Sequence, residues 1–149
     1  MRIDIANTDV DIAACYQVLH QLRPKLNEST FVDDVRRLQE GGYFLASLRD
    51  DDVVVRCVAG YRYYEMFATG VTLYVDDLVS DATHRSSGYG KAMLDWLIAE
   101  SVRNGCNFLT LDSGLKRLDA HRFYRKHGLQ DMALHFAIPV DGGPMWTSE

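Results

Sequence analysis

The sequence lacks several features that would assign it to a specialised class of protein. Its 149 residues include three cysteines, Cys15, Cys57 and Cys106, which are widely spaced and form no Cys-x-x-Cys pair. An odd number of cysteines in this pattern argues against a disulfide framework and against a zinc site. We therefore expect no metal ion and a reducing, cytoplasmic location.

Long apolar runs and basic stretches are also missing. The longest nearly apolar run, Ala92 to Ala99, is interrupted by Asp95 and is far too short to span a bilayer. The first residues contain no basic segment followed by an apolar one, so no signal peptide is expected. The formal net charge of −5 argues against binding to nucleic acid or an anionic membrane. Cationic small molecules suit this charge, although a mild acidic excess also serves solubility alone.

The composition that is present fits one globular domain. Hydrophobic residues make up 47% and charged residues 25% of the chain, which is ordinary for a globular protein. No internal repeat, low-complexity stretch or linker divides it. We expect a single domain over residues 1–149, with a loose tail at 139–149.

Apolar spacing and turn formers predict the order of the elements. A strand at 1–5 precedes a helix from a cap at 7–9 to about His20, and a second helix runs from near Thr30 to Gly41. Three strands follow, separated by turns at 50–52 and 69–70, and then come a helix at 89–104, a strand at 106–112, a helix at 119–127 and a last strand through Ile138. This order predicts an α/β (α+β) domain with a mixed, mostly antiparallel sheet and helices on both faces. The inward residues expected on the first two helices are Ile12, Cys15, Tyr16, Leu19, Phe31, Val35 and Leu38.

The segment 75–90, VDDLVSDATHRSSGYG, is a strand that runs into a polar turn and opens a helix. The first amides of a helix have no partner within the helix, and the helix dipole places partial positive charge there, so a phosphate is stabilised. Gly88 and Gly90 let the backbone approach an anion, and Arg85 adds a charge-assisted contact. The alternative is a plain helix start capped by Ser86 or Ser87. The turn lacks the GK[ST] ending of a P-loop and the spacing of a Rossmann motif.

Two motifs resemble those of the GNAT acyltransferases. RSSGYG at 85–90 matches the family signature [Q/R]-x-x-G-x-[G/A], and AHRFYRKHGL at 120–129 resembles a second marker, in which a Tyr follows an Ala by four residues. The resemblance covers residues 1–138 and implies a GNAT fold and an acetyl-CoA-dependent N-acetyltransferase. The chain departs from many family members at Arg117, where they have an Asn.

The resemblance also implies roles for individual residues in holding acetyl-CoA. Backbone groups of the strand would pair with the pantetheine arm, the N–H groups near Leu78 would polarise the thioester carbonyl, and the turn would surround the pyrophosphate. The residues so assigned are Leu78, Val79 and Ser80 on the strand and Arg85, Ser86, Ser87, Gly88, Tyr89, Gly90 and Lys91 in the turn.

Two further residues are assigned to catalysis. Tyr124 resembles the family tyrosine that protonates the coenzyme A sulfur, and its alternative role is that of a packed aromatic beside Phe123. YVDDLV is similar to a stretch of polyamine acetyltransferases, which implies that Asp76 is the base and that Asp77 has a structural or substrate-binding role. Strand alternation predicts that these two carboxylates point to opposite faces. His84 and His121 are expected to be solvent-facing or capping.

The acceptor is expected to be an amine-bearing small molecule or a protein, chosen by the segments 21–29 and 61–66; its identity is not encoded in the fold. A homodimer is also compatible with the resemblance. Two other functions fit the same motifs. One is a non-catalytic acyl-CoA-binding module, against which Tyr124 and the paired aspartates argue. The other is a toxin that acetylates charged tRNA, against which the acidic chain argues.

Overall fold

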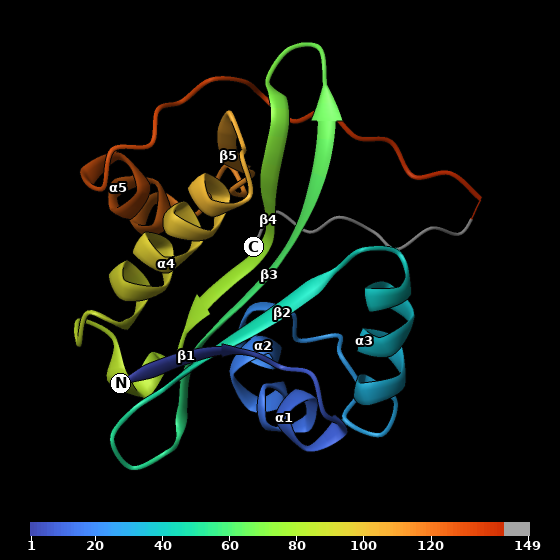
Figure 1. The fold of residues 1–149 in the computed structure, drawn as a ribbon, viewed down its shortest axis with the longest axis vertical. Helices are drawn as coiled ribbons and strands as arrows, with labels where there is room; N and C mark the ends of the chain where they lie inside the picture. Colours follow the sequence, from blue (N-terminus) through green and yellow to red (C-terminus); the bar gives the residue numbers. More distant parts are fainter. Residues whose placement is uncertain (142–149) are drawn as a thin grey trace. The chain divides into compact units, whose positions relative to one another are not determined.

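The computed structural model describes residues 1–141, which belong to two compact units, Met1–Leu111 and Asp112–Glu149. The first unit contains the sheet and four α-helices, and the described part of the second, residues 112–141, contains one α-helix (Figure 1). In chain order the elements are β1 (Arg2–Ile5), α1 (Asp9–Ala14), α2 (Tyr16–Leu22), α3 (Phe31–Glu40), β2 (Phe44–Arg49), β3 (Val55–Met66), β4 (Gly70–Ser80), the 3-10 turn η1 (Ala82–His84), α4 (Tyr89–Arg103), β5 (Phe108–Leu111) and α5 (Leu118–Lys126).

The five strands form one sheet in the order β1-β2-β3-β4-β5. The first four are antiparallel neighbours, and β5 is parallel to β4. A parallel neighbour needs a crossover connection, which α4 provides between β4 and β5. The predicted fold class, a mixed and mostly antiparallel sheet with helices, is therefore confirmed.

Each face of the sheet has its own apolar core. Figure 1 shows α1, α2 and α3 on one side of the sheet and α4 on the other. Side chains alternate along the strands, so neighbouring residues serve opposite cores. The core under α1–α3 includes Ile12, Tyr16, Leu19, Phe31, Val35, Tyr43, Leu45, Val58 and Val79. The core under α4 includes Ala46, Leu48, Ala59, Tyr61, Leu73, Val75, Met93 and Leu97.

The N-terminal helices differ from the prediction in two details. The single helix expected to reach His20 is divided at Cys15 into α1 and α2, and Thr8 caps α1 by accepting the Asp11 N–H. The residues expected to point inward along these two helices are buried. On α3, Phe31 and Val35 are buried, but Leu38 is 40% exposed because it lies in the last turn of the helix, next to the exposed residues 40–42.

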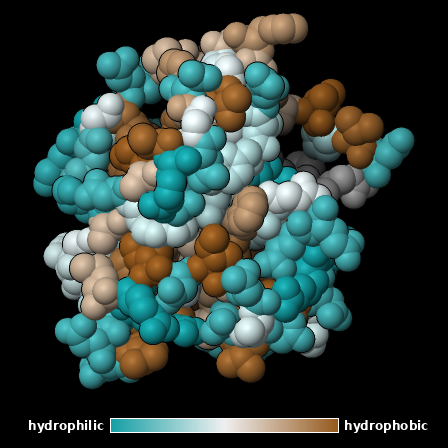
Figure 2. Space-filling model, viewed as in Figure 1, coloured by the Kyte–Doolittle hydropathy of each residue, from teal (hydrophilic) through white to brown (hydrophobic). Residues whose placement is uncertain are grey.

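The last predicted strand is wrong for the described part of the chain. The structure assigns no strand between 129 and 141, although the apolar alternation of Met132, Leu134, Phe136, Ile138 and Val140 is present. These residues are 68–87% exposed. Figure 2 shows that brown apolar residues lie among teal polar ones on the viewed face of the molecule. Alternation alone does not make a strand, because a strand requires a neighbour to pair its backbone groups. Most of the predicted loose tail, residues 142–149, lies outside the described residues.

Candidate active site

Strand β4 changes its pairing halfway along its length. From Thr72 to Val75 it pairs with β3 on one side and with β5 on the other. From Asp77 to Ser80 its register with β3 continues, whereas the register with β5 ends at Val75. The end of β4 therefore presents one open backbone edge within the described sheet, the kind of edge that an extended amide-bearing ligand can join as an additional strand.

The turn after β4 exposes the amides that begin α4. Gly88 is the N-cap of α4, with a φ of 83° in the left-handed region, and no side chain caps the helix there. Ser86 also has a positive φ, 71°. The alternative that Ser86 or Ser87 caps the helix is therefore wrong. The uncapped amides at 89–91 stay available for an external acceptor, because they have no partner within the helix.

The same turn fits an anion in charge and in shape. Arg85, Ser86, Ser87 and Gly88 are exposed, and a Cβ on Gly88 would meet nothing within 4 Å. The first turn of α4 carries no acidic residue, and Lys91 forms an ion pair with Asp95 at 2.6 Å. A phosphate can approach these amides closely and gains from the positive end of the helix dipole.

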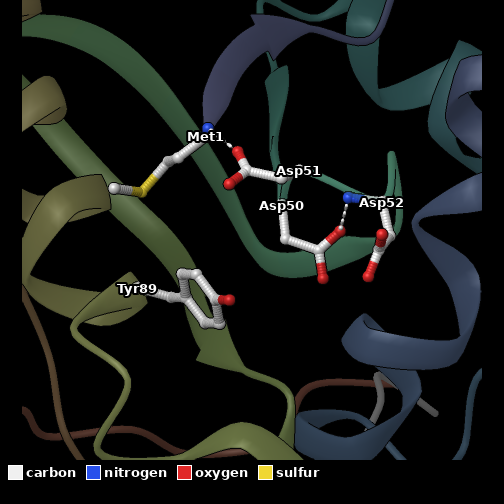
Figure 3. Close-up of a pocket in the computed structure, with 5 residues that line it drawn as sticks. All are labelled: Met1, Asp50, Asp51, Asp52 and Tyr89. Carbon is white, nitrogen blue, oxygen red and sulfur yellow. Dashed lines mark hydrogen bonds and ion pairs between the residues drawn. The ribbon is translucent and has the colours of Figure 1, made fainter.

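The side chain of Tyr89 is not placed to bind a phosphate. Figure 3 shows it facing a pocket that is also lined by Met1 and by the three aspartates of the β2–β3 turn, Asp50, Asp51 and Asp52. The N-terminal ammonium of Met1 forms an ion pair with Asp51 at 2.9 Å. Three carboxylates repel an anion, so this pocket is unsuited to a phosphate. Tyr89 can contribute to the turn through its backbone amide, while its ring packs against the α4 core.

A β-bulge brings Asp76 and Asp77 to the same face of the sheet. Gly60 pairs with Asp77 and Tyr61 pairs with Val75, so Asp76 is an extra residue in β4. Both carboxylates contact residues on the α1–α3 side: Asp77 accepts a hydrogen bond from Tyr43, and the Arg62 guanidinium that binds Asp76 lies 5.5 Å from the centre of the Tyr43 ring. The prediction that the two side chains point to opposite faces is therefore wrong, because alternation holds only for a regular strand.

Each of the two carboxylates has an arginine partner. Arg62 donates to both oxygens of Asp76, with its shortest contact at 2.6 Å from Nη2 to Oδ2. Burial raises the pKa of the Asp76 carboxyl above its ordinary value, while the hydrogen bonds from Arg62 act in the opposite direction. Arg23, which follows α2, donates to Asp77 Oδ1 at 2.8 Å and to the Asp76 carbonyl at 3.0 Å.

Comparisons with known proteins show the family to which the chain belongs. The model of the acetyltransferase (GNAT) family matches residues 12–129. The chain belongs to the GNAT acetyltransferase family. N-acetyltransferase YhdJ of Bacillus subtilis (strain 168) is 34% identical over 130 residues, which cover 86% of this chain and 91% of that protein. The protein is thus an acetyl-CoA-dependent N-acetyltransferase of the GNAT type.

Solved structures of other GNAT acetyltransferases share the fold of this chain. The ribosomal-protein-alanine N-acetyltransferase of Brucella melitensis biovar Abortus 2308 has a TM-score of 0.78 at 16% identity, covering 94% of this chain and 100% of that one. An aminoglycoside N-acetyltransferase in complex with CoA has a TM-score of 0.80 at 12% identity, covering 93% and 95%. At these identities the likeness establishes the fold alone.

The second GNAT motif lies in the second unit. Tyr124 is on α5, partly buried, and its ring is 5.5 Å from that of Phe123. Its carbonyl accepts the N–H groups of His127 and Leu129, which closes the helix at Gly128, with a φ of 95°. Arg117 is the N-cap of α5 and makes no side-chain cap hydrogen bond. His121 bonds the Gly114 carbonyl at 2.8 Å, which matches a structural role for this histidine.

The sequence reasoning missed the partners of the two aspartates. Tyr43, Arg62 and Arg23 come from three other segments, and only the fold brings them to β4. One residue in the sequence, Gly60, indicates the position of Tyr43. A Cβ on Gly60 would lie 1.8 Å from the Tyr43 hydroxyl. A glycine in a strand that is otherwise rich in large side chains indicates such a close approach.

Neither a membrane span nor a metal site is found in the described part of the chain. None of the helices within residues 1–141 has the length and apolar character needed to cross a bilayer. No group of three or more His, Cys, Asp or Glu side chains in those residues is arranged to hold a metal ion.

Proposed function

We propose that this GNAT enzyme transfers the acetyl group of acetyl-CoA to a primary amine by direct attack. The observation that carries the proposal is the uncapped start of α4, which follows a strand with one open edge. An open edge suits the amides of a pantetheine arm, and an uncapped helix start suits a pyrophosphate. The residues proposed for these contacts are Leu78, Val79 and Ser80 on β4 and Arg85 to Lys91 in the turn.

Asp76 is the proposed base. An alkylammonium with a pKa near 10 is almost wholly protonated at pH 7, and only the neutral amine attacks a thioester. Asp76 takes this proton, directly or through one water, and its carboxylate has further lone pairs beside those that Arg62 engages. The raised pKa of Asp76 supports the assignment, because it makes the carboxylate a better proton acceptor than an ordinary aspartate.

Tyr124 is the proposed acid. When the new C–N bond forms and the C–S bond breaks, the sulfur leaves as a thiolate and requires a proton. The Tyr124 hydroxyl donates that proton, and the phenol is available because it is protonated at neutral pH. The family match over residues 12–129 runs from the first unit into the second, which supports one functional domain across the chain.

An acceptor screen tests this function. Purified protein is supplied with acetyl-CoA and a panel of primary amines, and release of the coenzyme A thiol is followed. Tyr124→Phe removes one hydroxyl and little volume, so turnover should fall by roughly a hundredfold, the low end for a lost acid, while coenzyme A binding persists. Undiminished turnover in this variant would restrict Tyr124 to packing.

Coenzyme A binding tests separately the cofactor cradle, which is the proposed set of residues 78–80 and 85–91. At a hundred times its dissociation constant the ligand should add about 2.7 kcal/mol of stability, visible as a higher Tm. Gly88→Val places a branched side chain at a residue with φ of 83°, directly before the amides, and should abolish this shift. Gly105→Val is the matched control, because Gly105 has a φ of 70° at the opposite end of the same helix.

The acceptor is proposed to be a small molecule or a protein that carries a primary amine. The net charge of −5 favours a cationic acceptor. All three cysteines are free thiols, which supports a reducing compartment, and we infer a cytoplasmic location.

A further inference from the structure

Asp81, the first residue after β4, is the centre of a polar network that none of the assigned roles uses. Its side chain is largely buried, with the residue 9% exposed, and it lies four residues before the exposed turn at 85–88. One oxygen accepts hydrogen bonds from the Thr83 N–H and from Gln21, and the other accepts from the Thr83 hydroxyl and from Arg56 at 3.0 Å. We call Asp81, Arg56, Gln21 and Thr83 the Asp81 hub.

The hub joins three separate parts of the first unit. Arg56 belongs to β3, and its Nε also donates to Asp50 in the β2–β3 turn at 2.7 Å. Asp50 in turn accepts the N–H groups of Asp52 and Val54, the first of which is drawn in Figure 3. Gln21 lies at the end of α2, and besides its bond to Asp81 its side-chain oxygen Oε1 accepts the Ala82 N–H at 2.8 Å. A single carboxylate thus fixes the chain where it leaves β4.

This position matters because the turn that follows has little packing of its own. Residues 85–88 are exposed, so their place is set from both ends, by α4 on one side and by the hub on the other. The carbonyl of Asp81 also accepts the His84 N–H, which closes the 3-10 turn directly before Arg85. A change in the direction of the backbone at Asp81 would therefore displace the amides at 89–91.

We propose that Asp81 is a positioning residue that sets the affinity for the pyrophosphate of acetyl-CoA. It does so by fixing the position of the turn at 85–91, where α4 begins. The inference rests on the cradle described under the proposed function. Asp81 touches neither substrate nor reacting atoms, and it acts through Arg56, Gln21 and the 3-10 turn.

The chemistry of the hub requires a carboxylate at this position. Burial alone would raise the pKa of Asp81, but the Thr83 N–H, Gln21, the Thr83 hydroxyl and Arg56 together lower it to about 2. An asparagine has the same shape, but its NH2 group would replace one of the two oxygens. Either orientation then sets that NH2 against a group that can only donate, the Thr83 N–H on one side or Arg56 on the other. Such a mismatch leaves buried polar groups unsatisfied.

The test compares Asp81→Asn with wild type in binding and in turnover. Free coenzyme A is titrated calorimetrically, and the KM for acetyl-CoA and kcat are measured with the best amine of the screen. We expect the Kd and KM to rise roughly tenfold with kcat at saturation little changed, because a displaced turn weakens positioning. Gln21→Ala, at an exposed residue, should change the Kd in the same direction by less. Asp9→Asn, which removes an exposed ion pair between Asp9 on α1 and Arg36 on α3, is the control and should leave the Kd unchanged.

A second acetyl donor distinguishes a positioning role of Asp81 from general damage to the active site. Acetyl-pantetheine carries the thioester but no pyrophosphate, so its slow reaction should proceed equally in wild type and Asp81→Asn. An unchanged coenzyme A affinity in folded Asp81→Asn and Gln21→Ala, or an equal loss with both donors, would overturn the inference. Gly88→Val distinguishes the two proposals: if it weakens coenzyme A binding while Asp81→Asn does not, the cradle stands and the Asp81 inference fails. If Gly88→Val has no effect, both fail.

Discussion

The two faces of the sheet are built from the same strands but have different chemistry around the bulge. On the α4 side, Tyr61, Leu73 and Val75 lie in an apolar core with Met93 and Leu97. On the α1–α3 side, the neighbouring positions carry Arg62, Asp76 and Asp77, to which Arg23 adds a fourth charge. If β4 were a regular strand with the same sequence, alternation would direct Asp77 into the α4 core beside Leu73 and Val75. The bulge therefore keeps a carboxylate out of an apolar core and places both aspartates beside their arginine partners.

Truncating a leucine on the apolar α4 side of the sheet should give the largest loss of stability. Leu97 is fully buried in the α4 core, so Leu97→Ala should lower the free energy of unfolding by about 2–5 kcal/mol. Leu38→Ala on α3 is the control of equal chemistry, and its loss should be smaller because Leu38 is 40% exposed. Urea unfolding followed by circular dichroism measures both. Equal losses would show that the α4 face is not the more tightly packed one.

Removing charge from the other face should affect catalysis. Asp76→Asn should lower kcat/KM at neutral pH by about a hundredfold, the low end for a lost base, and activity should recover in alkaline medium, where solvent deprotonates the amine. Asp76 must be ionised to accept a proton, so wild-type activity is lost as the pH falls through its raised pKa. The acidic limb of the wild-type profile should therefore lie above 3.8, the ordinary value.

Asp77→Asn is the internal control for this profile. Both oxygens of Asp77 are engaged, one by Arg23 and one by Tyr43, so its loss should not be recovered at alkaline pH. A constant ratio of wild-type to Asp76→Asn activity between neutral and alkaline pH would leave the deprotonation to backbone and water.

A single methyl group at Gly60 should disturb the polar face from within. A Cβ there would meet the buried Tyr43 ring and hydroxyl, so Gly60→Ala should cost about 1–3 kcal/mol of stability and weaken the bond from Tyr43 to Asp77. Gly41→Ala is the control, because its new Cβ would meet the Leu38 carbonyl at an ordinary 3.4 Å. Thermal unfolding of the two variants checks the difference, which disappears if the Tyr43 side chain can move aside freely.

The cysteines provide the smallest effect and a probe on each face. Burial raises the pKa of the Cys15 thiol to about 12 and that of Cys57 to about 11, and both side chains are inaccessible. Cys15 lies in the α1–α3 core and Cys57 in the α4 core. In native protein a thiol reagent at pH 8 should modify the partly exposed Cys106 first. In Leu97→Ala, Cys57 should become reactive before Cys15, and the reverse order would contradict two separately packed faces.

Much of the fold was predictable because its signals are local. Turn formers at 50–52 and 69–70 delimit the meander, and the glycines at 88, 105 and 128 mark helix ends in backbone conformations that other residues rarely adopt. The turn at 85–91 was predictable for the same reason, since its geometry follows from consecutive residues. The strand predicted through Ile138 failed because its alternation states which side chains share a face but not which strand would pair with it.

The sequence by itself determined the family, the order of most elements and the turn that exposes the first amides of α4, since each depends on residues close together in the chain. The tertiary structure alone decided which charges meet. The bulge at Asp76 results from pairing with Gly60 and Tyr61, and the partners Arg23, Tyr43 and Arg62 reach β4 from three other segments. Asp81 is likewise an ordinary loop aspartate in the sequence, and becomes the centre of a network only when Gln21 and Arg56 fold against it. Charges pair over a few ångströms of space, and the sequence carries no local pattern for such distances.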